Sequence, residues 1–187
     1  MKKKTLISII AVALILCVSV GGALAWLTDK TDPVVNTFTV GDINIDLTES
    51  ENLDLKMVPG KTITKDPKVT VEKGSEASWL FVKVEKSTNA KFDDFMTYEM
   101  ADGWTALEGQ DGVFYRKVAA LTGTGADDMS FEVIKNNTVT VKAVVTKTML
   151  NGLTAETYPT LTFTAYAIQY DGFDNAASAW AEVSKTN

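Results

Sequence analysis

The sequence predicts an all-β protein, a jelly-roll-like antiparallel β-sandwich with short helical insertions and a short C-terminal helix. Apolar and polar residues alternate with period two along much of the chain, the pattern of strands with one buried face. Turn-forming pairs such as Pro59-Gly60, Asp111-Gly112 and Asn151-Gly152 punctuate this alternation at short intervals. No internal repeat or low-complexity linker interrupts the body, so a single domain is expected.

Six segments carry the alternation, and each is expected to form a strand whose apolar residues face a core. Threonine and charged residues fill the opposite face, which suits a pleated and solvated surface. Phe81 also lies on that opposite face. The residues expected to face the core are Phe38 and Val40; Ile43, Ile45 and Leu47; Val69 and Val71; Leu80, Val82 and Val84; Val139, Val141 and Ala143; and Leu161, Phe163, Ala165 and Ala167.

Two Asp-Gly pairs in the middle of the chain predict hairpins. Asp102-Gly103 and Asp111-Gly112 are each expected to connect two neighbouring strands, because Asp-Gly readily adopts the tight turn that a hairpin needs. The strands would lie near Thr97–Met100, Trp104–Leu107 and Val113–Lys117.

Two segments depart from the strand pattern. Leu121–Lys135 contains clustered glycine and aspartate and is expected to be a loop with a short helix. Asp174 is expected to cap a C-terminal helix, since the alanines that follow favour helix. The residues expected on the inner face of this helix are Ala176, Ala177, Trp180 and Val183.

The N-terminus has the three parts of a secretory signal peptide. Lys2-Lys3-Lys4 forms the basic start, and the apolar run Leu6–Val20 is 15 residues long, short of the roughly 20 that span a membrane. The small residues Ala23 and Ala25 predict cleavage after Ala25, so that the mature chain begins at Trp26.

The expected organisation therefore has three parts. Residues 1–25 are the signal peptide, residues 26–35 are an extended N-terminal segment, and residues 36–187 are one β-sandwich domain. The extended form of residues 26–35 is expected because Asp32-Pro33 disfavours helix at that point.

Composition argues against most catalytic functions. The chain has no histidine, and its one cysteine, Cys17, lies in the leader. This removes Ser-His-Asp and Cys-His arrangements and histidine-based zinc sites, so we expect no enzyme and no catalytic residue. Loss of the three leader lysines takes the formal charge from −6 to −9. That balance argues against nucleic acid, and against an anionic membrane after cleavage, as partners.

Calcium is the metal that the composition allows best. Asp127 and Asp128 lie in one expected loop, and Asp171 and Asp174 lie in another. Both loops have the density of oxygen ligands that Ca²⁺ prefers, although neither matches the twelve-residue calcium loop. They are weak extracellular candidates, and no other cofactor is expected.

Four aromatic residues fall near the expected hairpins: Tyr98, Trp104, Phe114 and Tyr115. They could form a strip that binds a glycan or a partner. Core packing and cross-strand pairing are the more frequent role of such residues.

Three blocks of the chain carry a family resemblance. They are Gly21–Asp29 with its continuation in Asn36–Glu49, then Met57–Val71, and then Ala165–Phe173. Together these blocks resemble the TasA/camelysin family of Gram-positive bacteria, whose members have a SipW-dependent type of signal peptide. Residues 86–135 match no part of that pattern, and their role stays open.

The resemblance implies a jelly-roll fold, cleavage by a SipW-type signal peptidase, and export to a biofilm matrix, a spore coat or the cell surface. Family members of the TasA type form fibres in which the N-terminal strand of one subunit completes the sheet of the next. Camelysin-type members are described as surface metallopeptidases, but this chain has no histidine to which that activity could be assigned.

The leading hypothesis is a secreted structural subunit that assembles into fibres by N-terminal donor-strand exchange. Trp26, Leu27, Val34 and Val35 are its expected donor anchors. The expected partners are a second copy of the chain, head to tail, and other matrix proteins. The alternatives are a monomeric surface- or glycan-binding module and a camelysin-like secreted metallopeptidase.

Overall fold

The computed structural model describes residues 41–50, 55–88 and 91–185. Contacts divide the chain into Met1–Thr39 and Val40–Asn187, and everything below concerns the second unit. The signal peptide, the cleavage residues, the donor anchors and the strand expected at Phe38 and Val40 lie outside the described residues.

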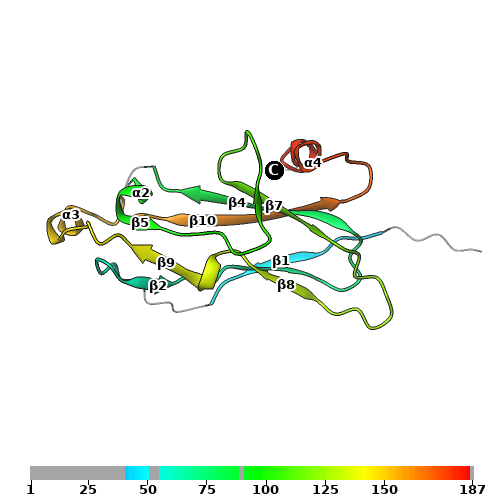
Figure 1. Cartoon of the computed structure of the whole chain (residues 1–187), viewed down its shortest axis with the longest axis horizontal. Helices are drawn as coiled ribbons and strands as arrows, with labels where there is room; N and C mark the ends of the chain where they lie inside the picture. The colour runs from blue at the N-terminus through cyan, green and yellow to red at the C-terminus, as the bar shows by residue number, and fades with distance from the viewer. Residues whose placement is uncertain (1–40, 51–54, 89–90, 186–187) are drawn as a thin grey trace, which may run out of the picture. The chain divides into compact units, whose positions relative to one another are not determined.

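Three antiparallel sheets form the body, which confirms the predicted all-β sandwich. Figure 1 shows the first two sheets end to end as one layer, with the third sheet as the other layer. The first sheet contains β1 (Ile45–Thr48), β3 (Lys68–Val71) and β8 (Met129–Glu132). The second contains β2 (Thr62–Thr64), β9 (Thr138–Val141) and β5 (Met96–Thr97). The third contains β10 (Leu161–Gln169), β4 (Ser78–Lys86), β7 (Val113–Val118) and β6 (Thr105–Ala106).

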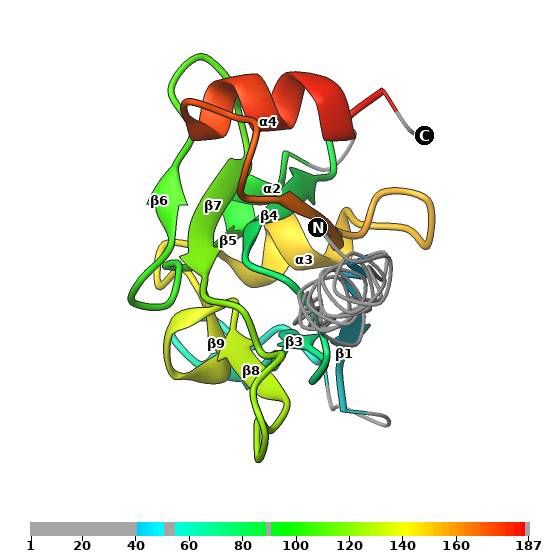
Figure 2. The same ribbon diagram turned by 90° about the vertical axis from the view of Figure 1, so that its right-hand side faces the viewer.

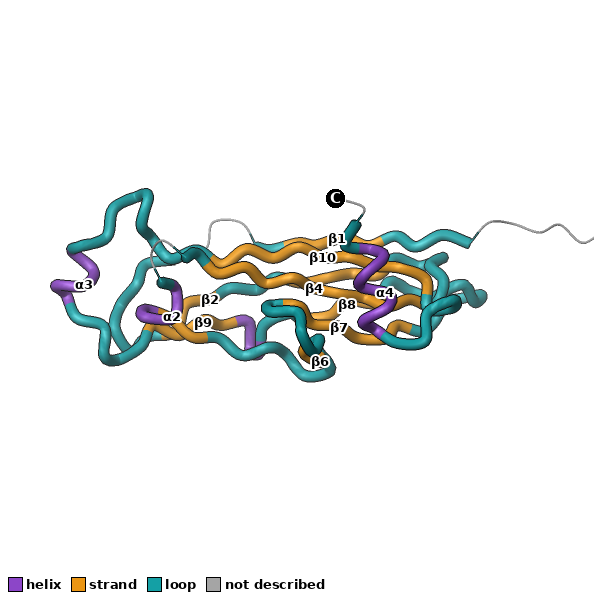
Figure 3. The backbone as a smooth tube through the Cα atoms, turned by 90° about the horizontal axis from the view of Figure 1, so that it is seen from above, coloured by secondary structure: helices purple, strands orange, loops and turns teal. Residues whose placement is uncertain are grey.

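The helices of the described residues are short. They are α2 (Phe92–Phe95), the 3-10 helix η1 (Lys135–Asn137), α3 (Lys147–Asn151) and α4 (Ala176–Val183). Seen from above in Figure 3, α2 and α3 lie at one end of the strands, and α4 lies over the other half. Short helical insertions and a C-terminal helix were both predicted from the sequence.

A kink divides the first layer into its two sheets. The stretch of chain that contains β2 and β3 pairs in both sheets with the stretch that contains β8 and β9. Ile63 lies opposite Val139 in one sheet, and Val69 lies opposite Phe131 in the other. Pro67 interrupts the first stretch, because proline has no N–H for the ladder. Asn136 and Asn137 interrupt the second with φ of 56° and 53°, a left-handed conformation that asparagine tolerates.

The main core lies between the two layers. Val69, Val71, Leu80, Val82 and Val141 are all fully buried there, as their alternation predicted. Strand β1 contributes half-buried side chains to the same core from the edge of its sheet, again as predicted. The expected strand at Val139–Ala143 is shorter than predicted, because it ends at Val141 and leaves Ala143 exposed in a turn.

A second core lies on the outer face of the third sheet. Phe81 is fully buried there, so its predicted place on a solvated face is wrong. Helix α4 covers this face, as Figure 2 shows, and Trp180 on α4 packs against the sheet as predicted. The ring centroid of Trp180 lies 5.3 Å from that of Phe81 and 5.2 Å from that of Tyr166.

Details of α4 differ from the prediction. The cap is Asn175, whose side chain accepts a hydrogen bond from the Ser178 N–H, and not Asp174. Ala176, Ala179 and Trp180 are buried, whereas Ala177 is exposed. Ala176, Ala179 and Trp180 are three or four positions apart and share one face of the helix, whereas Ala177 points about 100° away from Ala176.

Residues 97–135 contain two further corrections. The prediction that Leu121–Lys135 is a loop with a short helix is wrong, because this segment contains β8, paired with β3, and η1 begins only at its last residue. Asp102-Gly103 does not close a hairpin: β5 pairs with β9 in one sheet, whereas β6 pairs with β7 in another. The connection at Asp102-Gly103 therefore crosses from one layer to the other.

The hairpin at Asp111-Gly112 is confirmed, with β6 paired to β7. Gly112 has φ of +70°, and a Cβ there would lie 2.4 Å from the carbonyl oxygen of Val84. The N–H of Val84 donates to the Gly112 carbonyl over 2.8 Å, which requires this close approach. Glycine is needed here for both its conformation and its lack of a side chain.

Candidate functional site

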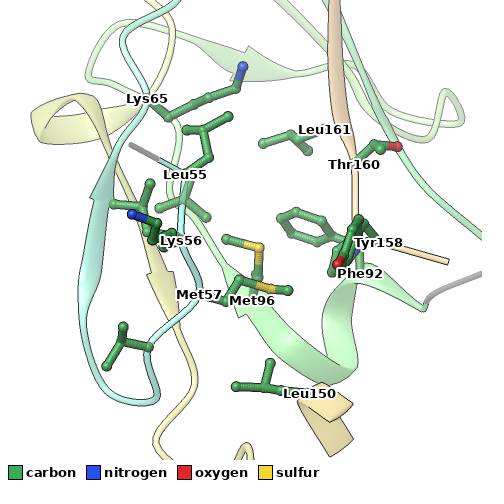
Figure 4. Close-up of a pocket in the computed structure, with 14 residues that line it drawn as sticks. Leu55, Lys56, Met57, Lys65, Phe92, Met96, Leu150, Tyr158, Thr160 and Leu161 are labelled. Carbon is green, nitrogen blue, oxygen red and sulfur yellow. The ribbon is translucent and has the colours of Figure 1, made fainter. Parts of the chain in front are cut away.

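An apolar slot of about 870 Å³ opens between the edges of the two layers. One wall is Leu55–Val58 with β2, and the other is Tyr158–Leu161, where β10 begins. Figure 4 shows Leu55 and Leu161 on opposite sides of the slot, with Phe92 and Met96 lower in the same view. The residues that line the slot are Leu55, Lys56, Met57, Val58, Ile63, Lys65, Phe92, Met96, Val139, Leu150, Tyr158, Pro159, Thr160 and Leu161.

Both walls include the outer edge of a sheet. Among the described residues, β2 forms a ladder only with β9, and β10 forms a ladder only with β4. An edge strand presents N–H and C=O groups that another extended chain can pair with. The slot therefore combines an apolar lining with two strand edges that lack a ladder neighbour within the described residues.

Exposed apolar side chains gather at this slot. Leu55 is 54% exposed, Val58 is 49% exposed and Tyr158 is 52% exposed. Of the two lysines that line the slot, Lys65 is neutralised: its Nζ lies 2.6 Å from Glu49 Oε2 and 5.5 Å from the ring centroid of Phe163. Exposed apolar surface of this extent makes the slot a candidate binding site.

The four aromatic candidates do not form one strip. Phe114 packs against the core between the layers, whereas the adjacent Tyr115 packs on the outer face, with its ring centroid 5.8 Å from that of Trp79. Trp104 Nε1 donates to the Glu132 carbonyl over 2.8 Å, and its ring lies against the guanidinium of Arg116. Cross-strand packing therefore accounts for Trp104 and Tyr115.

Tyr98 and Phe114 do share a second hollow, of about 720 Å³. Charged residues surround the two rings, among them Lys86, Asp93 and Asp111. Burial, aided by those two carboxylates, raises the pKa of Tyr98 to about 12. The Tyr98 hydroxyl therefore stays protonated, and able to donate a hydrogen bond, across the physiological range.

The four aspartates predicted as calcium ligands lie in two loops. Asp127 and Asp128 precede β8, and Asp171 and Asp174 follow β10. Asp128 Oδ1 accepts a hydrogen bond from the Lys73 N–H over 2.9 Å. In the part of the chain that the structure describes, no three His, Cys, Asp or Glu side chains come close enough together to hold a metal ion. Calcium binding stays a prediction.

None of the described helices combines the length and the apolar content needed to cross a membrane. The fold and the slot define this protein as an antiparallel β-sandwich with an open apolar edge. The chain belongs to the camelysin metallo-endopeptidase family, whose sequence profile matches residues 1–103 of its 187. This is the family that the sequence blocks resembled, and its members are secreted or surface proteins. No curated protein and no solved structure matches the chain.

The family name raises the question of a metal site. A zinc peptidase needs nitrogen or sulfur ligands alongside carboxylates, and this chain has no histidine and has its one cysteine at position 17. The donor groups of the described residues do not fit a catalytic zinc, and we assign no catalytic step to them.

The sequence led to a hypothesis about residues 26–35 as a donor segment, which lies outside the described residues, and it did not predict the slot. The slot is built from four separate stretches of chain, which contribute walls, floor and one end. One local signal was present: Leu55, Met57 and Val58 form an apolar run next to Pro59-Gly60 and outside any predicted strand.

Proposed function

We propose that this protein is a structural subunit of a secreted extracellular matrix or cell-surface assembly. Copies join head to tail, because residues 26–35 of one copy enter the slot of the next and pair with its open strand edges. The observation that carries the proposal is the slot itself, an apolar channel between β2 and β10, both of them edge strands within the described residues.

The chemistry of the donor segment supports this occupant. Trp26, Leu27, Val34 and Val35 supply apolar side chains, and ten extended residues span roughly 33 Å. Added strands of this kind gain affinity from backbone hydrogen bonds and specificity from side-chain pockets. Segment and slot thus complement each other in both backbone and side chains.

The chain enters the described residues at the end of the sandwich opposite the slot. The chain enters the described residues at Gly41, and Asp42 forms a bridge with Ser75. That bridge lies near the Gln169 end of β10, where Tyr170 N–H donates to the Ala77 carbonyl, whereas the slot lies at the Leu161 end. Eight residue steps of β10, roughly 27 Å, separate the two ends. A contact between unlike surfaces gives an open filament when its rotation does not close.

Signal cleavage would be the activating step. While Trp26 is joined to its leader, the segment cannot thread into a neighbour, and cleavage after Ala25 by a SipW-type peptidase frees it. We propose no catalytic activity and no required cofactor. Other matrix proteins with a free N-terminal strand are further candidate partners.

Deleting residues 26–35 from the mature protein is expected to abolish fibres, because the slot then has no donor. Electron microscopy and sedimentation of purified protein would measure this. The matched control is T28A/K30A, which alters the segment and keeps its four apolar anchors. Fibres of unchanged number and length from the deletion variant would contradict the donor role.

The second hollow supports one alternative, a glycan-binding module. Tyr98 and Phe114 supply ring faces, and the surrounding charged groups supply hydrogen bonds, a combination that binds sugars. If this function holds, Tyr98→Ala should weaken binding of neutral hexasaccharides at least about tenfold by calorimetry. Tyr158→Ala, an exposed tyrosine outside the hollow, should have no effect. Wild-type protein that binds none of the sugars would remove this alternative.

A further inference from the structure

Among the described residues, the end of the sandwich that holds the slot has more lysines than carboxylates. We define the slot end as residues 55–65, 91–95 and 142–160, which contain the slot walls, α2 and α3. Six lysines and three carboxylates give these ranges a formal charge of +3. Glu49, the ion-pair partner of Lys65, and Lys86, the partner of Asp93, lie outside the ranges, and their charges cancel each other. Lys61, Lys91 and Lys147 are exposed and form no ion pair among the described residues.

The opposite end is acidic. We define the exit end as residues 41–44, 72–77, 119–128 and 170–175. Hydrogen bonds connect these four stretches to one another. Its formal charge is −6, from seven carboxylates and one lysine. Within the described residues, none of the seven forms an ion pair. They are Asp42, Glu72, Glu76, Asp127, Asp128, Asp171 and Asp174.

The two ends face opposite directions along the strands. In Figure 1, α2, α3 and β2 lie at one end, and the start of β1 lies at the other, together with the loop that follows β10. The register agrees, since Leu161 pairs with Lys86 at the slot end and Gln169 pairs with Ser78 at the exit end. The sandwich therefore carries opposite charge at its two ends although its net charge is strongly negative.

We propose that the acidic exit end of one copy docks on the basic slot end of the next, and that this attraction orients the copies before the donor segment inserts. The inference rests on the proposed head-to-tail assembly and deepens it, since it names the surface that guides the segment. The described residues begin at Gly41, within the exit end, and the donor segment precedes them in the chain. Correct docking of the ends therefore delivers the donor segment to the slot.

Opposite charges on the two ends raise the rate at which two copies meet and favour one relative orientation of the copies. Complementary charged surfaces raise association rates by roughly 10 to 1,000-fold, and salt screens them over about 8 Å at physiological ionic strength. Two copies meeting by like ends, exit to exit, would repel each other. The charge pattern thus favours a polar filament over a symmetric dimer.

An anionic membrane is the competing partner for the slot end. Val144 is 75% exposed and Met149 is 36% exposed beside the lysines, a combination that also suits a lipid surface. The exit end favours a second copy, because the same chain supplies the complementary charge.

Charge swapping tests the proposal on the mature protein. The slot-end variant K61E/K91E/K147E changes the charge of that end from +3 to −3, and the exit-end variant E72K/E76K/D127K/D171K changes the other end from −6 to +2. All seven residues are exposed, and none of their side chains makes a described hydrogen bond or ion pair. Each variant alone should assemble at least about tenfold more slowly than wild type at low salt, by light scattering. An equimolar mixture should recover to within about threefold of wild type, because each mutated end then meets a complementary one.

The outcomes separate this inference from the proposed function. Wild-type rates from both single variants, or a mixture that fails to recover while thermal melts show folded protein, would overturn end-to-end docking. Binding of a labelled Trp26–Thr39 peptide to protein lacking residues 26–35 reports on the slot alone at high salt. If the peptide binds and the charge variants assemble normally, the donor mechanism stands and the inference falls.

If the slot-end variant loses only its binding to phosphatidylglycerol vesicles, the partner is a membrane and the inference falls. A mature wild-type chain that never self-associates would overturn both.

Discussion

Replacing Phe81 by alanine is expected to lower the free energy of unfolding by ~3–5 kcal/mol, the usual cost of removing a large core side chain. Phe81 is fully buried on the outer face of the third sheet. Its ring centroid lies 5.3 Å from that of Trp180 and 6.3 Å from that of Tyr115, so the substitution leaves a cavity beneath α4. Urea denaturation of the mature protein would measure the change.

Tyr158→Ala is the matched control for the Phe81 prediction, since it removes an aromatic ring that is 52% exposed. Its effect on the free energy of unfolding should stay within about 0.5 kcal/mol. A Phe81→Ala variant that loses less than about 1 kcal/mol, well below the range for large core truncations, would show that α4 does not cover this face in solution.

Phe81 also shows the limit of what period-two alternation can predict about burial. Period two predicted β4 and its inner face, Leu80, Val82 and Val84, because a strand places alternate residues on one side. It put Phe81 on the solvated side with Lys83 and Glu85. Burial of that side depends on α4, about one hundred residues later in the chain, and no local pattern in β4 contains this information.

The shortest elements could not be predicted for a different reason. Strands β5 and β6 have two residues each, and β2 has three, which is too few for a periodic signal. Their places are set by pairing with longer neighbours, β9 and β7. The hairpin expected at Asp102-Gly103 failed for this reason, since the turn chemistry was sound but the two flanking strands belong to different sheets.

The donor segment and the slot, the two partners in the proposed contact, also differ in how far the sequence alone can predict them. The sequence suggests a donor segment, because the expected leader, cleavage residues and extended segment follow one another along the chain, and this stays a prediction. The slot could not be predicted, because its walls come from residues more than ninety positions apart, such as Leu55 and Leu161. Only the fold brings these apolar residues together at two strand edges.

The double variant L55A/Y158A is expected to weaken binding of the Trp26–Thr39 peptide at least about tenfold, or ~1.4 kcal/mol. Leu55 and Tyr158 belong to opposite walls of the slot, and each would lose apolar contact with the inserted segment. Because both side chains are about half exposed in the free protein, their removal should leave folding stability nearly unchanged. Fluorescence anisotropy of labelled peptide with protein lacking residues 26–35 would measure the affinity.

Val144→Ala is the control for the slot variant, because Val144 is the most exposed of the large apolar side chains described and does not line the slot. It should leave peptide affinity unchanged within about twofold, since a surface residue outside the contact contributes little binding energy. Equal affinity of L55A/Y158A and wild type would place the donor segment elsewhere. Equal weakening by Val144→Ala would point to non-specific apolar adsorption, since only residues that line the slot can distinguish an inserted strand from a segment that adheres to the surface around it.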